Sequence, residues 1–164
     1  MIIGIILVVV VIPFEDNSAP RVIFANSGES QNFEPLEHEM METNGVKHLI
    51  PLDKIKGGGP PKDGIPSVDN PVFVNAEDAN FMSDSDTVIG LKIKGETKAY
   101  PLFVLVWHEI VNDTVGNTPV SITYCPLCYT NQVFERIIDG ETVEFGTSGK
   151  LYNSNLLMYD RLTE

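Results

Sequence analysis

The sequence predicts an α+β domain, mainly antiparallel β with one or two short helices. Two turn signals, Lys94-Gly95-Glu96 and Asp139-Gly140, each lie between stretches that alternate apolar and polar residues, which is typical of β-hairpins. A third apolar stretch opens at Pro101 and has the spacing of one helix face. The length of 164 residues fits a single domain, for which about 100–200 residues is usual.

The chain divides into three parts. Met1–Ile12 is uninterrupted apolar sequence, which indicates a signal or membrane anchor segment; a buried N-terminal strand is the alternative. Residues 13–44 are acidic and poor in apolar residues, so they predict a flexible linker. Residues 45–164 form the predicted domain. Its first feature after an ordered entry is the Lys56–Pro66 loop, whose glycines and prolines predict irregular backbone at the surface or close to a site.

The elements of the domain follow from the periodicity and the turn signals. Alternation predicts strands before and after each turn, and Pro101 suits the first turn of a helix. We expect a hairpin of 87–93 with 97–100, a helix over Leu102–Asn112, a turn over Asp113–Thr118, a strand over Val120–Tyr124, a hairpin of Gln132–Ile138 with Glu141–Phe145, and a last strand within Lys150–Tyr159.

The net charge of −12 bounds the partners of the domain. Binding to nucleic acid depends on clustered lysine and arginine, which this chain does not offer, so we expect no nucleic acid partner. We expect membrane association through Met1–Ile12. The sequence names no small-molecule or protein partner and no substrate, and whether the protein is an enzyme stays open.

Both cysteines of the chain, Cys125 and Cys128, lie in one Cys-Pro-Leu-Cys segment after the predicted strand. Two thiols so close together can share a metal ion, cycle between dithiol and disulfide, or form a structural disulfide. We expect them at one tight turn. The spacing alone leaves the three uses open.

A metal site at this turn would need further ligands. His108 is the third candidate, and Met158, Asp160 or water the fourth. Thiolate and imidazole together favour copper or zinc over magnesium or calcium, with Met158 pointing to Cu(I) and Asp160 to zinc.

Two arginines form a second candidate group. Arg136 and Arg161 lie on neighbouring predicted strands, each next to an acidic residue. An ordinary cross-strand ion pair is one interpretation, and a clamp for an anion or carboxylate is the other.

These motifs together resemble the DUF3179 family, a domain of unknown function, over about residues 46–164. The resemblance is carried by Trp107–Asp113, Thr123–Cys128, Phe134–Arg136, Phe145–Ser154 and Met158–Arg161. It implies that His108, Cys125, Cys128, Asp160 and Arg161 occupy motif positions. Tyr129 departs from the family pattern, which usually has a small residue there. Family members also continue beyond the Tyr-Asp-Arg segment, which implies that this chain is a short or C-terminally truncated member.

The sequence therefore predicts an exported or membrane-tethered, extracytoplasmic protein with a metal-binding or redox site centred on Cys125 and Cys128. The alternative is a non-enzymatic ligand-binding module in which the two cysteines form a structural disulfide. In an exported protein a disulfide is the default state of two adjacent thiols, unless a metal protects them.

Overall fold

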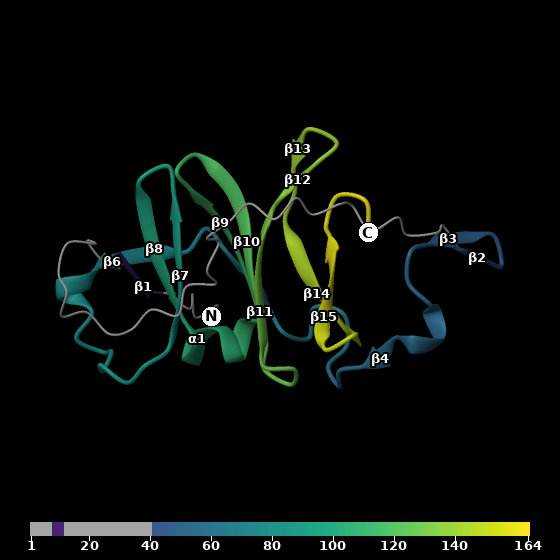
Figure 1. The fold of residues 1–164 in the computed structure, drawn as a ribbon, viewed down its shortest axis with the longest axis horizontal. Helices are drawn as coiled ribbons and strands as arrows, with labels where there is room; N and C mark the ends of the chain where they lie inside the picture. The colour runs from purple at the N-terminus through teal and green to yellow at the C-terminus, as the bar shows by residue number, and fades with distance from the viewer. Residues whose placement is uncertain (1–7, 12–40) are drawn as a thin grey trace, which may run out of the picture.

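The computed structural model describes residues 8–11 and 41–164, and most of these residues lie in β-strands. Three sheets follow one another along the long axis, and a separate hairpin lies at the far end (Figure 1). Most strand pairs are antiparallel, as the sequence predicts; β1–β6 and β5–β9 are parallel. The predicted linker over 13–44 falls largely outside the described residues.

The first sheet has four strands and contains the predicted hairpin around Lys94-Gly95, which the pairing of Ile93 with Glu96 confirms. Its other two strands come from distant parts of the chain. The order is β6 (Val72–Asn75), β1 (Val8–Val11), β8 (Glu96–Pro101) and β7 (Val88–Ile93).

The second sheet lies in the middle of the molecule and holds the two cysteines at one end. The strand that ends in Cys125, residues 118–125, pairs with a neighbour on each side along most of its length. The order is β11 (Thr130–Glu135), β10 (Thr118–Cys125), β9 (Ile110–Val115) and β5 (Val68–Asp69).

The third sheet is built mainly from the C-terminal part of the chain, and three smaller groups of elements complete the fold. Its order is β15 (Asn155–Asp160), β14 (Phe145–Tyr152) and β4 (Lys56–Gly57). The remaining elements are the β2 (Met41–Thr43) and β3 (Val46–His48) hairpin, the β12 (Ile137–Ile138) and β13 (Glu141–Thr142) hairpin, and the 3-10 turns Leu52–Lys54 and Ala76–Asp78. The hairpin predicted around Asp139-Gly140 is confirmed only next to its turn, where Ile137–Ile138 pairs with Glu141–Thr142; residues 132–135 pair with β10 instead.

The helix predicted over Leu102–Asn112 is too long. The helix α1 covers Leu102–His108, and residues 110–115 form β9 instead. Glu109 ends the helix because its backbone has φ +57°, which leaves the right-handed helical region. The predicted turn over Asp113–Thr118 shortens accordingly to Gly116 and Asn117.

The last predicted strand, Lys150–Tyr159, is also wrong, because it is two strands. Asn153 and Ser154 both have positive φ and reverse the chain between β14 and β15. Successive left-handed residues make the tight turn that suits the twist of a hairpin. The strand predicted over Val120–Tyr124 is confirmed within β10.

Two apolar clusters lie on opposite faces of the central sheet. Val120, Ile122 and Tyr124 of β10 enter the first cluster, between this sheet, the first sheet and α1, whereas Cys125 enters the second, towards β14 and β15. The intervening residues Ser121 and Thr123 are fully buried as well. A strand covered on both faces accounts for this near-continuous burial.

A buried ionic group ties the first two sheets together. The Lys98 ammonium donates to both carboxylate oxygens of Asp113 at 3.0 Å and to the Thr114 carbonyl at 2.8 Å. The Tyr100 hydroxyl donates to the same carboxylate at 2.8 Å. Burial, followed by the charge of Asp113, raises the pKa of Tyr100 far above its ordinary value. These groups satisfy one another, so they serve the fold.

The apolar N-terminal run is described only at Val8–Val11, which forms β1 between β6 and β8. The rest of Met1–Ile12 lies outside the described residues. Within the part of the chain that the structure describes, no helix has the length and apolar character needed to cross a membrane.

Candidate functional site

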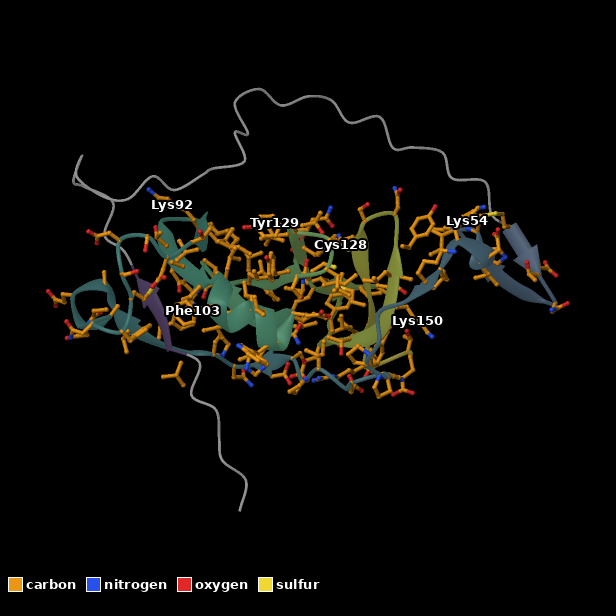
Figure 2. The ribbon with its side chains drawn as sticks, turned by 90° about the horizontal axis from the view of Figure 1, so that it is seen from below. Lys54, Lys92, Phe103, Cys128, Tyr129 and Lys150 are labelled. Atoms are coloured by element: carbon orange, nitrogen blue, oxygen red, sulfur yellow. The ribbon has the colours of Figure 1, made fainter. Side chains whose placement is uncertain are left out.

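Cys125 and Cys128 lie at one tight turn between β10 and β11, as the sequence predicts. Cys125 is the last residue of β10 and pairs in register with Thr130, so the turn between them holds both sulfurs. The Cys128 amide donates to the Cys125 carbonyl at 3.2 Å, which closes the turn. Both cysteines are free. Figure 2 labels Cys128 and Tyr129 at this turn.

The two thiols have different environments. Cys125 is fully buried in the second apolar cluster, whereas Cys128 is half-buried at its margin. Burial, followed by the interaction with the Cys128 side chain and the charge of Glu109, raises the pKa of the Cys125 thiol to about 12. Cys125 is therefore protonated at neutral pH, and Cys128 is the thiol that a reagent in solution can reach.

Glu109 lies beside the cysteines because β9 intervenes between α1 and β10. The Tyr124 amide donates to the Glu109 carbonyl at 2.8 Å, so the end of the helix adjoins the end of β10. The helix predicted from the sequence ends at residue 112, and a strand running back along it would bring Cys125 to the N-terminal end of that helix. In the structure the helix ends at His108 and β9 follows it, so Cys125 lies near the C-terminal end of the helix. Burial raises the pKa of the Glu109 carboxyl above its ordinary value.

The Gly- and Pro-rich loop closes over this corner of the molecule. We call residues 57–66 the strap. The Gly58 amide donates to the Gly149 carbonyl at 2.8 Å, and the Asp63 amide donates to the Thr147 carbonyl at 2.9 Å. A Cβ on Gly149 would overlap the carbonyl oxygen of Pro60. The close approach of two backbones is thus the physical reason for glycine here.

A hollow of about 20 Å³ lies under the strap. Glu109 lines it together with Leu127 of the cysteine turn, Leu156 of β15 and Pro60 of the strap. This volume is about what one water molecule needs. Glu109 therefore lines a small, mostly apolar hollow where the strap, the cysteine turn and β15 converge, and Leu156 connects this hollow to the apolar cluster of Cys125.

His108 is buried at the end of α1, and its ring is held by the strap. Its Nδ1 donates to the Pro66 carbonyl at 2.8 Å. A carbonyl only accepts, so Nδ1 carries a proton and a neutral ring keeps its lone pair on Nε2. The contacts of His108 are thus with the strap.

Met158 and Asp160 of β15 have different surroundings. Met158 packs against the apolar cluster that contains Cys125, as Cys128 does. Asp160 accepts hydrogen bonds from the Leu162 and Thr163 amides and from the Thr163 hydroxyl, which lower the pKa of its carboxyl. It therefore organises the turn after β15. Among the described residues, no three or more His, Cys, Asp or Glu side chains gather as they would around a metal ion.

Arg136 is buried and bonds to the main chain. Its Nε donates to the Asp113 carbonyl at 3.1 Å and its Nη1 to the Val143 carbonyl at 2.7 Å. These bonds join β9 to the segment between β13 and β14.

Arg161 lies in a separate polar group. It donates to the carboxylates of Asp69 at 2.7 Å and Glu144 at 3.1 Å, and to the Ser67 hydroxyl at 2.6 Å. Burial alone would lower the pKa of Arg161, but the bond to Asp69 and the opposite charges raise it above its ordinary value. An anion clamp made of both arginines would have to displace these internal partners.

The sequence pattern alone assigns no role to Glu109. Its place in the site depends on where the helix ends, and no glycine or proline marks that end. Its acidic side chain between apolar Trp107, Ile110 and Val111 is the one signal in the sequence that could have drawn attention to it.

Comparison with known proteins adds a family and no activity. The sequences of curated proteins and of solved structures give no match. The family model described as "Protein of unknown function (DUF3179)" matches residues 62–164. This range begins inside the strap and includes β15, so it contains both cysteines, His108, Glu109 and the two arginines, whereas Gly58 and Pro60 of the strap lie before it. The cysteine turn and the elements that enclose it are thus family structure, and the chain belongs to the DUF3179 family.

Proposed function

We propose that Cys125 and Cys128 form a thiol–disulfide redox centre. The observation that carries the proposal is the placement of two free thiols at one turn, Cys128 half-buried and Cys125 fully buried within reach of the Glu109 charge. In this proposal the two cysteines are a redox pair and not metal ligands. The co-reactant is a disulfide, either of a small molecule or of a protein.

The chemistry divides between the two thiols. The Cys128 thiolate attacks the external disulfide, forms a mixed disulfide and releases the first thiolate of the co-reactant. Cys125 then loses its proton and attacks the Cys128 sulfur, which releases the second thiolate and closes the Cys125–Cys128 disulfide. The centre loses two electrons, and the external disulfide gains them and becomes two thiols.

Oxidised glutathione tests the division of roles. Wild-type protein should end as an intramolecular disulfide without an adduct, and dithiothreitol should restore both thiols. Cys125→Ala should instead trap glutathione on Cys128, whereas Cys128→Ala should react slowly because Cys125 is buried. Intact-mass spectrometry distinguishes these products. A stable glutathione adduct on the wild type, or faster reaction of Cys128→Ala than of Cys125→Ala, would contradict the proposal.

The copper or zinc site predicted from the sequence stays a prediction. Its support is that Met158 and Cys128 pack against the cluster containing Cys125, which places three sulfur-bearing side chains in one region. Soft ligands of this kind favour Cu(I). Elemental analysis of untagged, reduced protein, together with thiol counting, checks it.

The alternative function, a ligand-binding module stapled by a disulfide, draws on Arg136 and Arg161. Both guanidinium groups have internal partners, which makes the redox centre the better-supported proposal. Export or membrane tethering through Met1–Ile12 belongs to the proposal as well, and its support is the uninterrupted apolar run.

A further inference from the structure

Glu109 has a backbone conformation that a residue with a Cβ rarely adopts. Its φ is +57° and its ψ is −34°. Two hydrogen bonds fix it: its amide donates to the Leu105 carbonyl at 2.7 Å, and its carbonyl accepts from the Tyr124 amide at 2.8 Å. A strained residue of this kind costs about 1–3 kcal/mol and persists where the surroundings determine it, often at functional sites. The chain thus holds a carboxyl group at the junction of α1 and β10 at some cost in stability.

The surroundings of the Glu109 side chain are apolar on most sides. It lines the hollow under the strap with Leu127, Leu156 and Pro60. The charged or titratable groups that approach it are Cys125, whose thiol feels its charge, and Lys150 of β14, which also lines the hollow.

We propose that Glu109 is the proton acceptor for the Cys125 thiol when the Cys125–Cys128 disulfide closes. This inference rests on the proposed redox function and assigns the step that the function leaves without a base. The mixed disulfide on Cys128 is attacked only by a Cys125 thiolate, and the buried thiol cannot pass its proton directly to bulk water. Glu109 and Cys125 share a neighbour, because Leu156 lines the hollow with Glu109 and packs in one apolar cluster with Cys125.

The proton and electron balance is complete. Glu109 carboxylate takes the proton of the Cys125 thiol, and the Cys125 thiolate attacks Sγ of Cys128. The bond between Cys128 and the co-reactant breaks, and the co-reactant leaves as a thiolate with the electron pair. Glu109 then returns its proton to solvent. The raised pKa of Glu109 supports this role, because a base whose pKa lies nearer that of its proton donor accepts the proton more readily.

Stopped-flow reaction of the reduced full chain with the aromatic disulfide dithionitrobenzoate separates the two steps. The first equivalent of released thiolate reports attack by Cys128, and the second reports closure by Cys125. Cys125→Ala defines the one-equivalent signal. The variant is Glu109→Gln, which keeps the shape of the side chain, and Glu135→Gln, at an exposed position of β11, is the matched control.

In Glu109→Gln we expect the second phase at neutral pH to slow by about 10²-fold, the usual scale of general base catalysis. The first phase should not change, and Glu135→Gln should behave as wild type. A second phase in Glu109→Gln with the wild-type rate and pH dependence overturns the role of Glu109 and leaves the redox function standing. Release of one equivalent by the wild type overturns the redox function itself.

The wild-type pH profile gives an independent readout if Glu109→Gln does not fold, as judged by circular dichroism. The closure rate should rise across the ionisation of a group with a pKa above the ordinary glutamate range, as well as with thiol ionisation. A closure rate that follows thiol ionisation alone would overturn the inference.

Discussion

At the scale of single residues, Tyr129 gives the cysteine turn a backbone conformation that is unfavourable for a residue with a Cβ. The residue has φ +57°, is largely exposed, and its ring meets Tyr124 edge to face at 6.3 Å. A small residue is expected here on physical grounds, because glycine adopts this conformation without steric cost. Tyrosine lacks the conformational freedom of glycine, but its ring gains one contact with Tyr124.

Replacing Tyr129 tests this balance. Tyr129→Gly should leave the free energy of unfolding within about 1 kcal/mol of wild type, because relief of the left-handed strain offsets the lost ring contact and the added freedom of the unfolded chain. Tyr129→Val should lower it by about 1–2 kcal/mol, because a β-branched residue fits this conformation poorly. Urea denaturation measures both variants. A glycine variant less stable than the valine variant would refute this explanation.

Glu109 also makes the stability of the protein depend on pH. Its pKa is raised by burial, so the unfolded chain releases this proton at lower pH than the folded chain does. The stability that the neutral carboxyl allows is present below the ordinary glutamate range and is lost as pH rises through the raised pKa. The wild type should thus lose stability relative to Glu109→Gln over this window, which is consistent with a residue retained for chemistry rather than for folding.

At the scale of elements, the strap is the part that converts a hairpin turn into an enclosed site. It reaches β14 through paired backbone groups, and its proline carbonyl lies against Gly149. The third sheet therefore packs against Cys125 and also holds the strap in place over Glu109.

A pair of glycine substitutions tests the attachment of the strap. Gly149→Ala and Gly140→Ala both add a Cβ at positive φ, +70° and +85°, but only the first meets the strap backbone. Gly140→Ala should cost about 1 kcal/mol of unfolding free energy, and Gly149→Ala about 1–3 kcal/mol more because of overpacking. In Gly149→Ala, hydrogen exchange should also accelerate at the Gly58 and Asp63 amides. Equal costs for the two variants would show that the strap does not press on β14.

The elements also show what the sequence could predict. The hairpins at Lys94-Gly95 and Asp139-Gly140 carry glycine turn signals and are confirmed at their turns. The end of α1 carries no such signal, since Ile110 and Val111 continue the helical spacing and fit a buried strand equally well. The sequence predicts a strand across Asn153 and Ser154, because no glycine marks the turn that these residues form.

The same limits apply to the site. The two-residue spacing of Cys125 and Cys128 was enough to predict their common turn. The position of Glu109 was not predictable, because it follows from the register of β9 with β10, in which Thr123 pairs with Ile110. Long-range pairing of this kind is set by the packing of whole sheets and leaves little trace in local sequence.

At the scale of the whole molecule, the compartment determines what the thiol pair can do. A cytosolic pair is kept reduced, whereas an exported pair meets an oxidising environment. Export through the apolar run Met1–Ile12 is the proposal that bears on this question, and the described part of the run, Val8–Val11, pairs with β6 and β8 as a strand.

A reporter fusion tests the compartment. We expect the first 20 residues to carry a fused reporter out of the cytosol or to its membrane, because their apolar stretch has the length of a signal core, about 7–15 residues. Cell fractionation measures the outcome, with a fusion carrying Val9→Asp and Ile6→Asp as the control. A reporter that stays soluble in the cytosol would leave Val8–Val11 only its role as a core strand.

The central claim is that Cys125 and Cys128 exchange electrons reversibly, and redox titration of the full chain against glutathione tests it most directly. We expect a single two-electron transition, read by alkylation and mass, with a potential within about −120 to −270 mV, the range of proteins that exchange thiols and disulfides. Glu135→Gln should titrate as wild type, and Cys125→Ala should show no such transition. A disulfide that resists reduction to below about −300 mV would instead be a structural staple and would contradict the claim.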